Sequence, residues 1–291
     1  MAPPPLPNLS ACKKLGFIVP SSNTALEPLT SSILSSLPSH NIIPLFTRIR
    51  VTTVGTDPTT TAQFSTTTLI AAAQLLADAE ADAILWNGTS GMWTGESLEA
   101  DQVLADAMTQ ATGIRCSTTT LATVAAVEFL GVSNLGVAVP YSPDLAERVR
   151  QFFVSTKYGW NVTAVATLDP VPAGNLAIAK SSLADIKAVV RKACSPSSPA
   201  GNKAEAVIVA CTNWPAASLA EEVEAETGVV VVDSITVTTW HGLRMLGCHD
   251  AIRGWGGLLS NPHKTGAGAR LTSDSSSKRV NGEGNGEIVR V

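Results

Sequence analysis

The sequence predicts an α/β fold of two pseudo-symmetric, Rossmann-like lobes, each with a parallel sheet flanked by helices. Two observations support this prediction. Short apolar runs alternate with longer segments of helical periodicity along most of the 291 residues, as they do in parallel α/β folds. Segments of the first half also recur, in the same order, in the second half. Because duplicated lobes place equivalent strand ends opposite one another, we expect the active site in the cleft between the lobes.

The first half of the chain contains four apolar runs with helical patterns between them. The run LGFIVP ends at Pro20 and continues into Ser-Ser-Asn-Thr, residues that favour the start of a helix. A later helical pattern carries an apolar stripe from Leu69 to Ala79. The predicted strands are 15–20, 42–46, 83–86 and 113–116, and the predicted helices begin near residue 25 or span 62–79, 97–111 and 120–130.

The second half repeats this order of strand and helix. Its apolar run 206–210 lies between charged residues and the segment Cys-Thr-Asn-Trp-Pro, which is typical of a buried central strand. The strands predicted here are 135–139, 162–167, 206–210 and 229–232, and the predicted helices are 145–155, 183–194, 217–227 and 234–246.

An internal repeat relates the two halves. LGFIVPSSNTALEP from residue 15 aligns with LGVAVPYSPDLAER from 135, ADAILWNGTSG from 81 with AEAVIVACTNW from 204, and TGIRCSTTT from 112 with TGVVVVDSI from 227. The offsets of 120, 123 and 115 residues share one register with small insertions. We therefore predict one lobe from 14–120 plus 234–258, a second from 121–233, a disordered leader of 1–13 and a disordered tail of 264–291.

The composition excludes several classes of protein. A net charge of −4 without a basic cluster disfavours nucleic-acid binding, and no apolar run approaches the roughly 20 residues of a membrane span. The first 14 residues have no apolar core, so no secretory signal is expected. The 5 cysteines are scattered and never form CxxC, which favours free thiols in a reducing compartment over disulfides or metal. These features predict a cytoplasmic enzyme with no metal.

Cys211 is the strongest candidate for chemistry. It follows the buried run 206–210, and Thr212 and Asn213 come next, on the loop that should open the following helix. In parallel α/β folds, ligands bind at the carboxyl ends of the strands, and the backbone N–H groups at the start of a helix can bind an anion. The alternative is that Cys211 is one more small buried hydrophobe. The repeat places the loop 211–214 opposite 88–91, and 140–144 opposite 21–24.

These loops resemble those of the aspartate/glutamate racemase superfamily, which includes maleate cis–trans isomerase and arylmalonate decarboxylase. The similarity rests on PSSNT, on the Gly-Thr-Ser loop at 88–90, on Tyr141 and on CTN at 211–213, and it covers about 14–258. The racemases and the isomerase carry one cysteine in each lobe, whereas this chain has Gly88 at the first position. In having a single cysteine at these positions, the chain resembles arylmalonate decarboxylase, which expels carbon dioxide without any cofactor.

The resemblance implies a role for each motif residue. Cys211 would protonate an enediolate whose carboxylate is held by Thr89, Ser90 and Tyr141, and Gly88 would leave the room that a second cysteine takes in the racemases. If the thiol must be protonated before turnover, activity should fall at alkaline pH as the thiolate forms. The reference thiol pKa is about 8.5, and the nearby helix start should shift it. The expected substrate-binding residues are Ser22, Asn23, Thr212, Asn213, Met92 and Trp214.

Alternatives stay open for these assignments. Ser22 and Asn23 belong to a Ser-Ser-Asn-Thr run that maleate isomerase has and the decarboxylase lacks, and they also suit a helix N-cap. Met92 and Trp214 suit ordinary core packing equally well. The favoured function is a cofactor-free decarboxylase of a substituted malonate-type dicarboxylic acid. A maleate-type isomerase and a non-catalytic carboxylate-binding protein are the alternatives, and homo-oligomerisation is left open.

Overall fold

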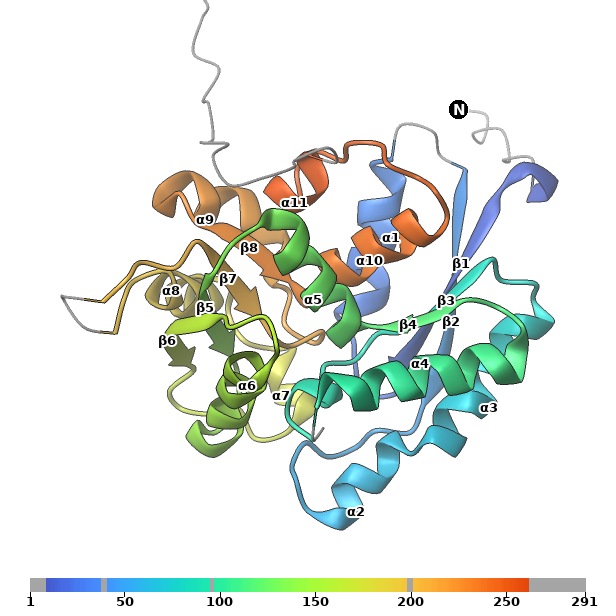
Figure 1. The fold of residues 1–291 in the computed structure, drawn as a ribbon, viewed down its shortest axis with the longest axis horizontal. Coiled ribbons are helices and arrows are strands. Elements are labelled where there is room, and N and C mark those ends of the chain that lie inside the picture. The colour runs from blue at the N-terminus through green and yellow to red at the C-terminus, as the bar shows by residue number, and fades with distance from the viewer. Residues whose placement is uncertain (1–8, 38–40, 95–96, 198–200, 262–291) are drawn as a thin grey trace, which may run out of the picture.

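Two four-stranded parallel sheets, one for each half of the chain, form the frame of the molecule (Figure 1). The computed structural model describes residues 9–37, 41–94, 97–197 and 201–261. The first sheet has the order β2-β1-β3-β4 and the second the order β6-β5-β7-β8, so their topology is identical. The strands are β1 Lys13–Pro20, β2 Ile42–Ile49, β3 Ala83–Trp86, β4 Cys116–Thr118, β5 Asn134–Val139, β6 Asn161–Thr167, β7 Ala206–Val209 and β8 Val230–Asp233. The predicted duplicated α/β fold is confirmed.

Helices connect the strands and flank both sheets. The α-helices are α1 Leu26–Ser35, α2 Pro58–Thr61, α3 Thr66–Asp78, α4 Leu98–Thr112, α5 Thr119–Leu130, α6 Pro143–Ser155, α7 Asn175–Ile178, α8 Leu183–Ala193, α9 Ala220–Thr227, α10 Ser234–Met245 and α11 Gly257–Ser260. The 3₁₀ helices are η1 Leu9–Ala11, η2 Ala62–Phe64, η3 Ser90–Met92 and η4 Ala216–Leu219. Within the described residues, no helix combines the length and the apolar character that crossing a membrane requires.

Several predicted boundaries shift for local reasons. Ser65 accepts a hydrogen bond from the Thr68 N–H, and this cap starts α3 at Thr66 instead of at 62. Gly113 takes the left-handed φ of 72° that ends α4, so β4 lies later than the predicted 113–116. Of the predicted leader, residues 1–8 lie outside the described residues, while η1 and the start of β1 occupy 9–13. The predicted tail of 264–291 lies wholly outside them.

Alternation along β1 gives the first sheet two apolar faces. Phe17 and Val19 join the cluster that contains Leu26 of α1, whereas Ile18 joins the cluster that contains Leu69 of α3. The helix α10 follows a strand of the second sheet, yet it packs against α1, β3 and α5. Gly242 permits this approach, because a Cβ there would meet both methyl groups of the Leu15 side chain at 2.9 Å. Helices thus tie the two sheets together beside the strand ends that form the site.

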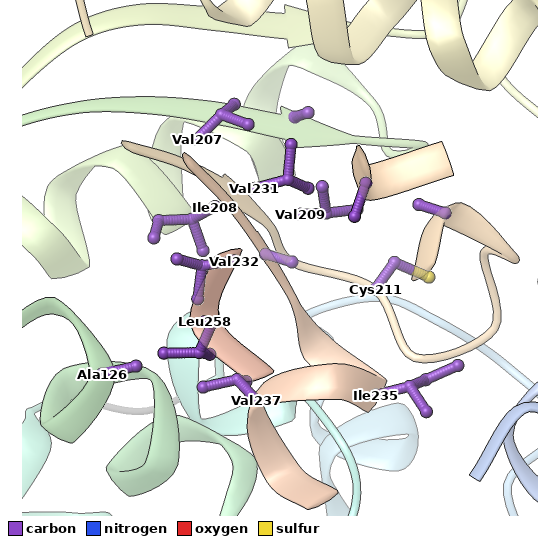
Figure 2. Packing of buried hydrophobic residues seen from close by; sticks show 14 of the residues in the cluster. Ala126, Val207, Ile208, Val209, Cys211, Val231, Val232, Ile235, Val237 and Leu258 are labelled. Carbon is purple, nitrogen blue, oxygen red and sulfur yellow. The ribbon is translucent and has the colours of Figure 1, made fainter. Parts of the chain in front are cut away.

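The second sheet is buried by aliphatic residues. Val207, Val209, Val231 and Val232 pack with residues of α5, α10 and α11 in one continuous cluster. Figure 2 shows this packing, with Cys211 at its edge just beyond the end of β7. The Cys211 thiol therefore lies between the apolar cluster of its own lobe and the loops of the first lobe. This position determines how strongly the thiol is shielded from water.

Candidate active site

A small cavity of about 40 Å³ lies where the carboxyl ends of β1, β3, β5 and β7 meet. Both lobes contribute to it, as the sequence repeat predicts. Its walls are formed by Pro20, Asn23, Val51, Val54, Phe64, Trp86, Gly88, Thr89, Ser90, Trp93, Tyr141, Asn175, Cys211, Thr212 and Asn213. The site therefore combines a single thiol, several hydroxyls and amides, and an aromatic wall.

Cys211 supplies the thiol. Its side chain is 2% exposed, and burial raises its pKa to about 11. A hydrogen bond with Tyr141 and backbone N–H groups of Asn213 and Trp214 oppose this rise, and the charge of Asp233 adds to it. The expected helix start beside Cys211 is absent, because a turn follows it and η4 begins only at Ala216. The thiol is consequently protonated across the neutral pH range.

Hydroxyl groups face the cavity from the ends of β3 and β5. Thr89 Oγ1 and the Tyr141 hydroxyl share a hydrogen bond of 3.3 Å, and both residues are buried. Burial, together with the nearby Cys211, raises the pKa of Tyr141 well above its ordinary value, so the phenol keeps its proton. Ser90 Oγ accepts a hydrogen bond of 3.3 Å from the indole N–H of Trp86. Each of these hydroxyls carries one proton, and one of the two protons of the Thr89–Tyr141 pair lies in the bond between them. The other proton of the pair and that of Ser90 can be donated to an anion.

Gly88 occupies the position where a second thiol would lie, but the space beside it is filled. A Cβ built on Gly88 would meet Cζ2, Cε2 and Cη2 of Trp86 at 2.3, 2.6 and 2.8 Å. The expectation that Gly88 leaves room for a second cysteine side chain is therefore wrong in this chain. Glycine is required here because the indole of Trp86 covers its Cα.

A network of amides joins the lobes beside the cavity. Asn23 Oδ1 accepts from the N–H groups of Ala25 and Leu26 at the start of α1, which is the capping role that the sequence left open. Its Nδ2 donates to Thr212 Oγ1 at 3.1 Å. Asn213 Oδ1 accepts from the N–H of Thr24 at 3.0 Å. These bonds hold the end of β7 against the start of α1.

Asn175 of α7 extends this network. Its side chain donates to Ser22 Oγ at 2.7 Å, and its carbonyl accepts from Asn213 Nδ2 at 2.7 Å. Ser22 in turn donates to the carbonyl of Val51 at 2.6 Å. Ser22 does not line the cavity, although it was predicted to bind substrate, and its bonds anchor the loop after β2. Asn175 was not predicted, because a single Asn in an irregular segment carries no sequence signal.

The family model of arylmalonate decarboxylase matches residues 54–259, a span that includes every strand end of this cavity except that of β1. The chain belongs to the arylmalonate decarboxylase family. The predicted resemblance is thus confirmed. A comparison with curated proteins gives no match.

Solved structures with the same fold include enzymes of two reaction types. The maleate isomerase Iso of Pseudomonas putida S16 superposes with a TM-score of 0.75 at 21% identity, over 87% of this chain and 100% of that one. The maleate cis–trans isomerase of Nocardia farcinica gives 0.74 at 22% identity, over 86% and 98%. Arylmalonate decarboxylase itself gives 0.68 at 22% identity, over 85% and 99%.

In this member of the arylmalonate decarboxylase family, aromatic rings and valines form the apolar wall of the cavity. Phe64 packs against Trp86 and Trp93 with ring centroids 6.1 and 5.7 Å apart, and Trp93 contacts Tyr141 at 6.3 Å. Val51 and Val54 complete the wall from the loop after β2. The valines were not predicted, because their segment resembles an ordinary Thr-, Gly- and Pro-containing loop, and Phe64 was not predicted, because it lies in the stretch 62–79 that was expected to be helical.

Met92 and Trp214 were predicted to bind substrate, but neither lines the cavity. Both are nearly inaccessible, at 1% and 0% exposure, and both belong to the main apolar cluster. They pack beneath the loops that carry Ser90 and Cys211, which was the alternative interpretation of their apolar character. The aromatic residue that reaches the cavity from the first of these loops is Trp93.

A larger cavity of about 280 Å³ adjoins the site and shares Val54 and Tyr141 with it. It continues along the start of α6, where Arg148 lines it, to the loop that precedes α7. Among the described residues, no group of three or more His, Cys, Asp or Glu side chains is arranged to bind a metal ion.

Asp233 lies behind Cys211 at the end of β8. Its Oδ1 accepts from the N–H groups of Ile235 and Thr236 and so caps α10, while its buried Oδ2 has no hydrogen-bond partner. Burial raises the pKa of this carboxyl to about 7. The acidic residue beside the thiol was not singled out in the sequence, because Asp before Ser is an ordinary helix cap.

Proposed function

We propose that this chain decarboxylates a malonate-type dicarboxylic acid with a substituted α-carbon, without a cofactor. The observation that carries the proposal is one buried, protonated thiol, that of Cys211, in the same cavity as the hydroxyls of Thr89, Ser90 and Tyr141. This arrangement suits a reaction that needs one proton donor and a set of donors for a developing oxyanion.

In the first step, the hydroxyls bind one carboxylate of the substrate. The bond between the α-carbon and the other carboxylate breaks, carbon dioxide leaves, and the electron pair spreads into the bound carboxylate as an enediolate. Hydrogen bonds from Thr89, Ser90 and Tyr141 strengthen as charge accumulates on those oxygens. The apolar wall of Val51, Val54 and Phe64 favours neutral carbon dioxide over a charged carboxylate.

In the second step, the Sγ–H of Cys211 protonates the α-carbon of the enediolate. The product is a monocarboxylic acid, and the thiolate that remains takes a proton from water before the next turnover. Burial raises the pKa of the Cys211 thiol, so the proton is present on Sγ when the enediolate forms. The proton moves because the α-carbon of the enediolate is a stronger base than the thiolate. One thiol on one side of the cavity delivers the proton to one face of the substrate.

The substrate's side group needs more space than the catalytic cavity provides. At about 40 Å³ the cavity is far below the usual size of a ligand site, whereas the adjoining cavity of about 280 Å³ approaches it. We place the side group in this larger space, past Tyr141 and Val54. The dicarboxylate itself is the small-molecule partner that this function implies.

A maleate-type cis–trans isomerase is the second candidate. The Ser-Ser-Asn-Thr run favours it, since Asn23 and Thr212 contribute polar groups beside the thiol. A cysteine-to-serine variant of the Nocardia farcinica isomerase carries a covalently bound succinylcysteine intermediate. Attack of this kind needs a thiolate, and in this chain position 88 has no thiol while Cys211 has a raised pKa. These observations weigh toward decarboxylation.

The test is incubation with phenylmalonate, methylmalonate and maleate in deuterated buffer, followed by nuclear magnetic resonance. Loss of one carboxylate with a single deuterium at the α-carbon supports the decarboxylase. Conversion of maleate to fumarate supports the isomerase instead. If both the wild-type protein and Cys211→Ala bind the diacids without turnover, the remaining interpretation is a non-catalytic carboxylate-binding protein.

A further inference from the structure

We propose that Trp86 is a positioning residue that commits this site to one thiol and orients the Ser90 hydroxyl as a donor. Its packing role stands on geometry alone, and its role in orienting Ser90 rests on the proposed decarboxylation. Trp86 ends β3, and its side chain is 2% exposed. Unlike the hydroxyl residues after it, Trp86 carries no group that reacts, so its effect must come from shape and from its single N–H.

The first effect is steric. A Cβ on Gly88 would lie 2.3 to 2.8 Å from three atoms of the six-membered ring of Trp86, closer than real side chains approach. The indole cannot simply turn away, because Phe64 packs on it and its N–H is bound to Ser90. Any side chain at position 88, a thiol included, is therefore excluded by Trp86.

The second effect is on the direction of a proton. An indole N–H only donates, so Ser90 Oγ must be the acceptor of its bond with Trp86. A serine hydroxyl has one proton, which is then left to be donated elsewhere. Because Ser90 lines the cavity, this proton is available to a carboxylate that carries developing negative charge. Trp86 thus fixes Ser90 as a donor before the substrate binds.

The steric effect is tested by a stability cycle on the full chain. Gly88→Ala adds only the Cβ and should lower Tm by roughly 2–10 °C, the range expected for overpacking. In the Trp86→Leu background, which also has a lower Tm, the same glycine substitution should cost nothing further. Gly55→Ala is the matched control, because its Cβ would meet its nearest neighbour, Asp57, at an ordinary 3.5 Å. Additive changes in Tm, or a Gly88→Ala variant that melts with the wild type, would overturn the inference.

The same pair of positions has a chemical test. Gly88→Cys in the Trp86→Leu background places a second thiol opposite Cys211, and such a pair can exchange the α-proton of the product acid. Deuterium exchange into a chiral monoacid product should appear in this double variant and be absent from Gly88→Cys alone. Equal exchange in both variants would mean that Trp86 does not exclude the second thiol.

The hydrogen bond is tested by Trp86→Phe, which keeps an aromatic ring and removes the N–H. We expect kcat to fall about tenfold with KM nearly unchanged, because the lost orientation matters most in the transition state. In a Ser90→Ala background, Trp86→Phe should change kcat no further. Trp240→Phe is the matched control, since this buried tryptophan lies outside the cavity and its N–H has no partner among the described residues.

The outcomes separate the inference from the proposed function. A KM increase without loss of kcat, or equal losses in the presence and absence of the Ser90 hydroxyl, would contradict the positioning role. If the wild-type protein decarboxylates no diacid, the proposed function fails, and the Tm cycle alone decides whether Trp86 excludes a side chain at position 88.

Discussion

The ends of β3 and β7 are equivalent positions in two copies of one fold, yet they carry different chemistry. Each strand pairs with the first strand of its lobe on one side and the last strand on the other. After β7 comes the thiol of Cys211, whereas after β3 come Gly88 and the hydroxyls of Thr89 and Ser90. The backbone topology is conserved between the lobes while the reactive side chains are not.

This difference suits the proposed reaction, in which the proton is delivered to one face of the substrate. Two equivalent thiols would take and return a proton on opposite faces of a carbon acid. With Trp86 filling the space at Gly88, the proposed reaction takes its proton from one lobe, while Thr89 and Ser90 of the other lobe join Tyr141 as donors for negative charge. The predictions below break or sharpen this division between the lobes, from the largest expected effect to the smallest.

Replacing the thiol should have the largest effect. Cys211→Ala removes the proton donor, and we expect kcat to fall by about 10²–10⁴-fold, the usual contribution of general acid catalysis. Binding of a diacid, measured by calorimetry, should be nearly unchanged, because the hydroxyls of Thr89 and Ser90 remain. Cys116→Ala is the control, since Cys116 lines a different groove beside α4 and should leave kcat at the wild-type value. Undiminished turnover in Cys211→Ala would remove the thiol from the reaction.

Removing a hydroxyl from the lobe opposite should have the next largest effect. Ser90→Ala or Thr89→Val deletes one oxyanion donor, which typically lowers kcat by about 10²–10³-fold. KM should change less than kcat, because the bond strengthens as charge develops. Steady-state kinetics of the two variants and of Tyr141→Phe would compare the donors directly. A variant that raises KM alone would place its hydroxyl in ground-state binding instead.

The fold and much of the lining of the candidate site could be predicted from the sequence. Alternating strands and helices fixed the class, and the repeat located the facing strand ends, so Cys211, Thr89, Ser90 and Tyr141 were found to lie in one cavity. These predictions succeed because the positions and ends of strands follow local apolar patterns. Candidate site residues that come directly after a buried strand can therefore be recognised from the sequence alone.

Long-range contacts explain what the sequence could not predict. Trp86 lies within the strand preceding Gly88, and nothing in the sequence indicates that its ring folds back over that glycine. Asn175 reaches the site from a segment without periodicity, through a bond to Ser22 that is 153 residues away. The raised pKa of Cys211 likewise depends on burial between lobes and not on a neighbouring helix start.

The burial of Cys211 predicts the shape of the alkaline pH profile. In the proposed reaction the protonated thiol is the active form, so activity should persist through neutral pH and fall as the thiolate forms, near the raised pKa of about 11. Above that value the rate should drop about tenfold per pH unit. The alkylation rate of Cys211 by iodoacetamide, corrected with Cys211→Ala for the other free cysteines, reports the same ionisation. A decline that begins near the ordinary thiol pKa would show that the cavity does not desolvate Cys211.

Asp233 should shift this profile by the smallest amount. Its equivalent in the first lobe, Thr118, caps α5 with a neutral hydroxyl, whereas Asp233 caps α10 with a carboxyl group beside the thiol. At alkaline pH the carboxylate is ionised and its charge raises the pKa of Cys211. Asp233→Asn keeps a capping oxygen and removes the charge, so the alkaline limb should move to lower pH, by about one unit or less for one nearby charge.

Thr118→Ala is the matched control for this shift. It deletes the equivalent cap of α5, which accepts from the N–H of Leu121, without changing any charge beside Cys211. It should therefore lower Tm and leave the alkaline limb in place. If both variants moved the alkaline fall in activity by the same amount, the cause would be the loss of a helix cap instead of the loss of charge. A limb that moves only in Asp233→Asn would show that the two lobes differ in the electrostatics behind the strand ends as well as in the side chains on them.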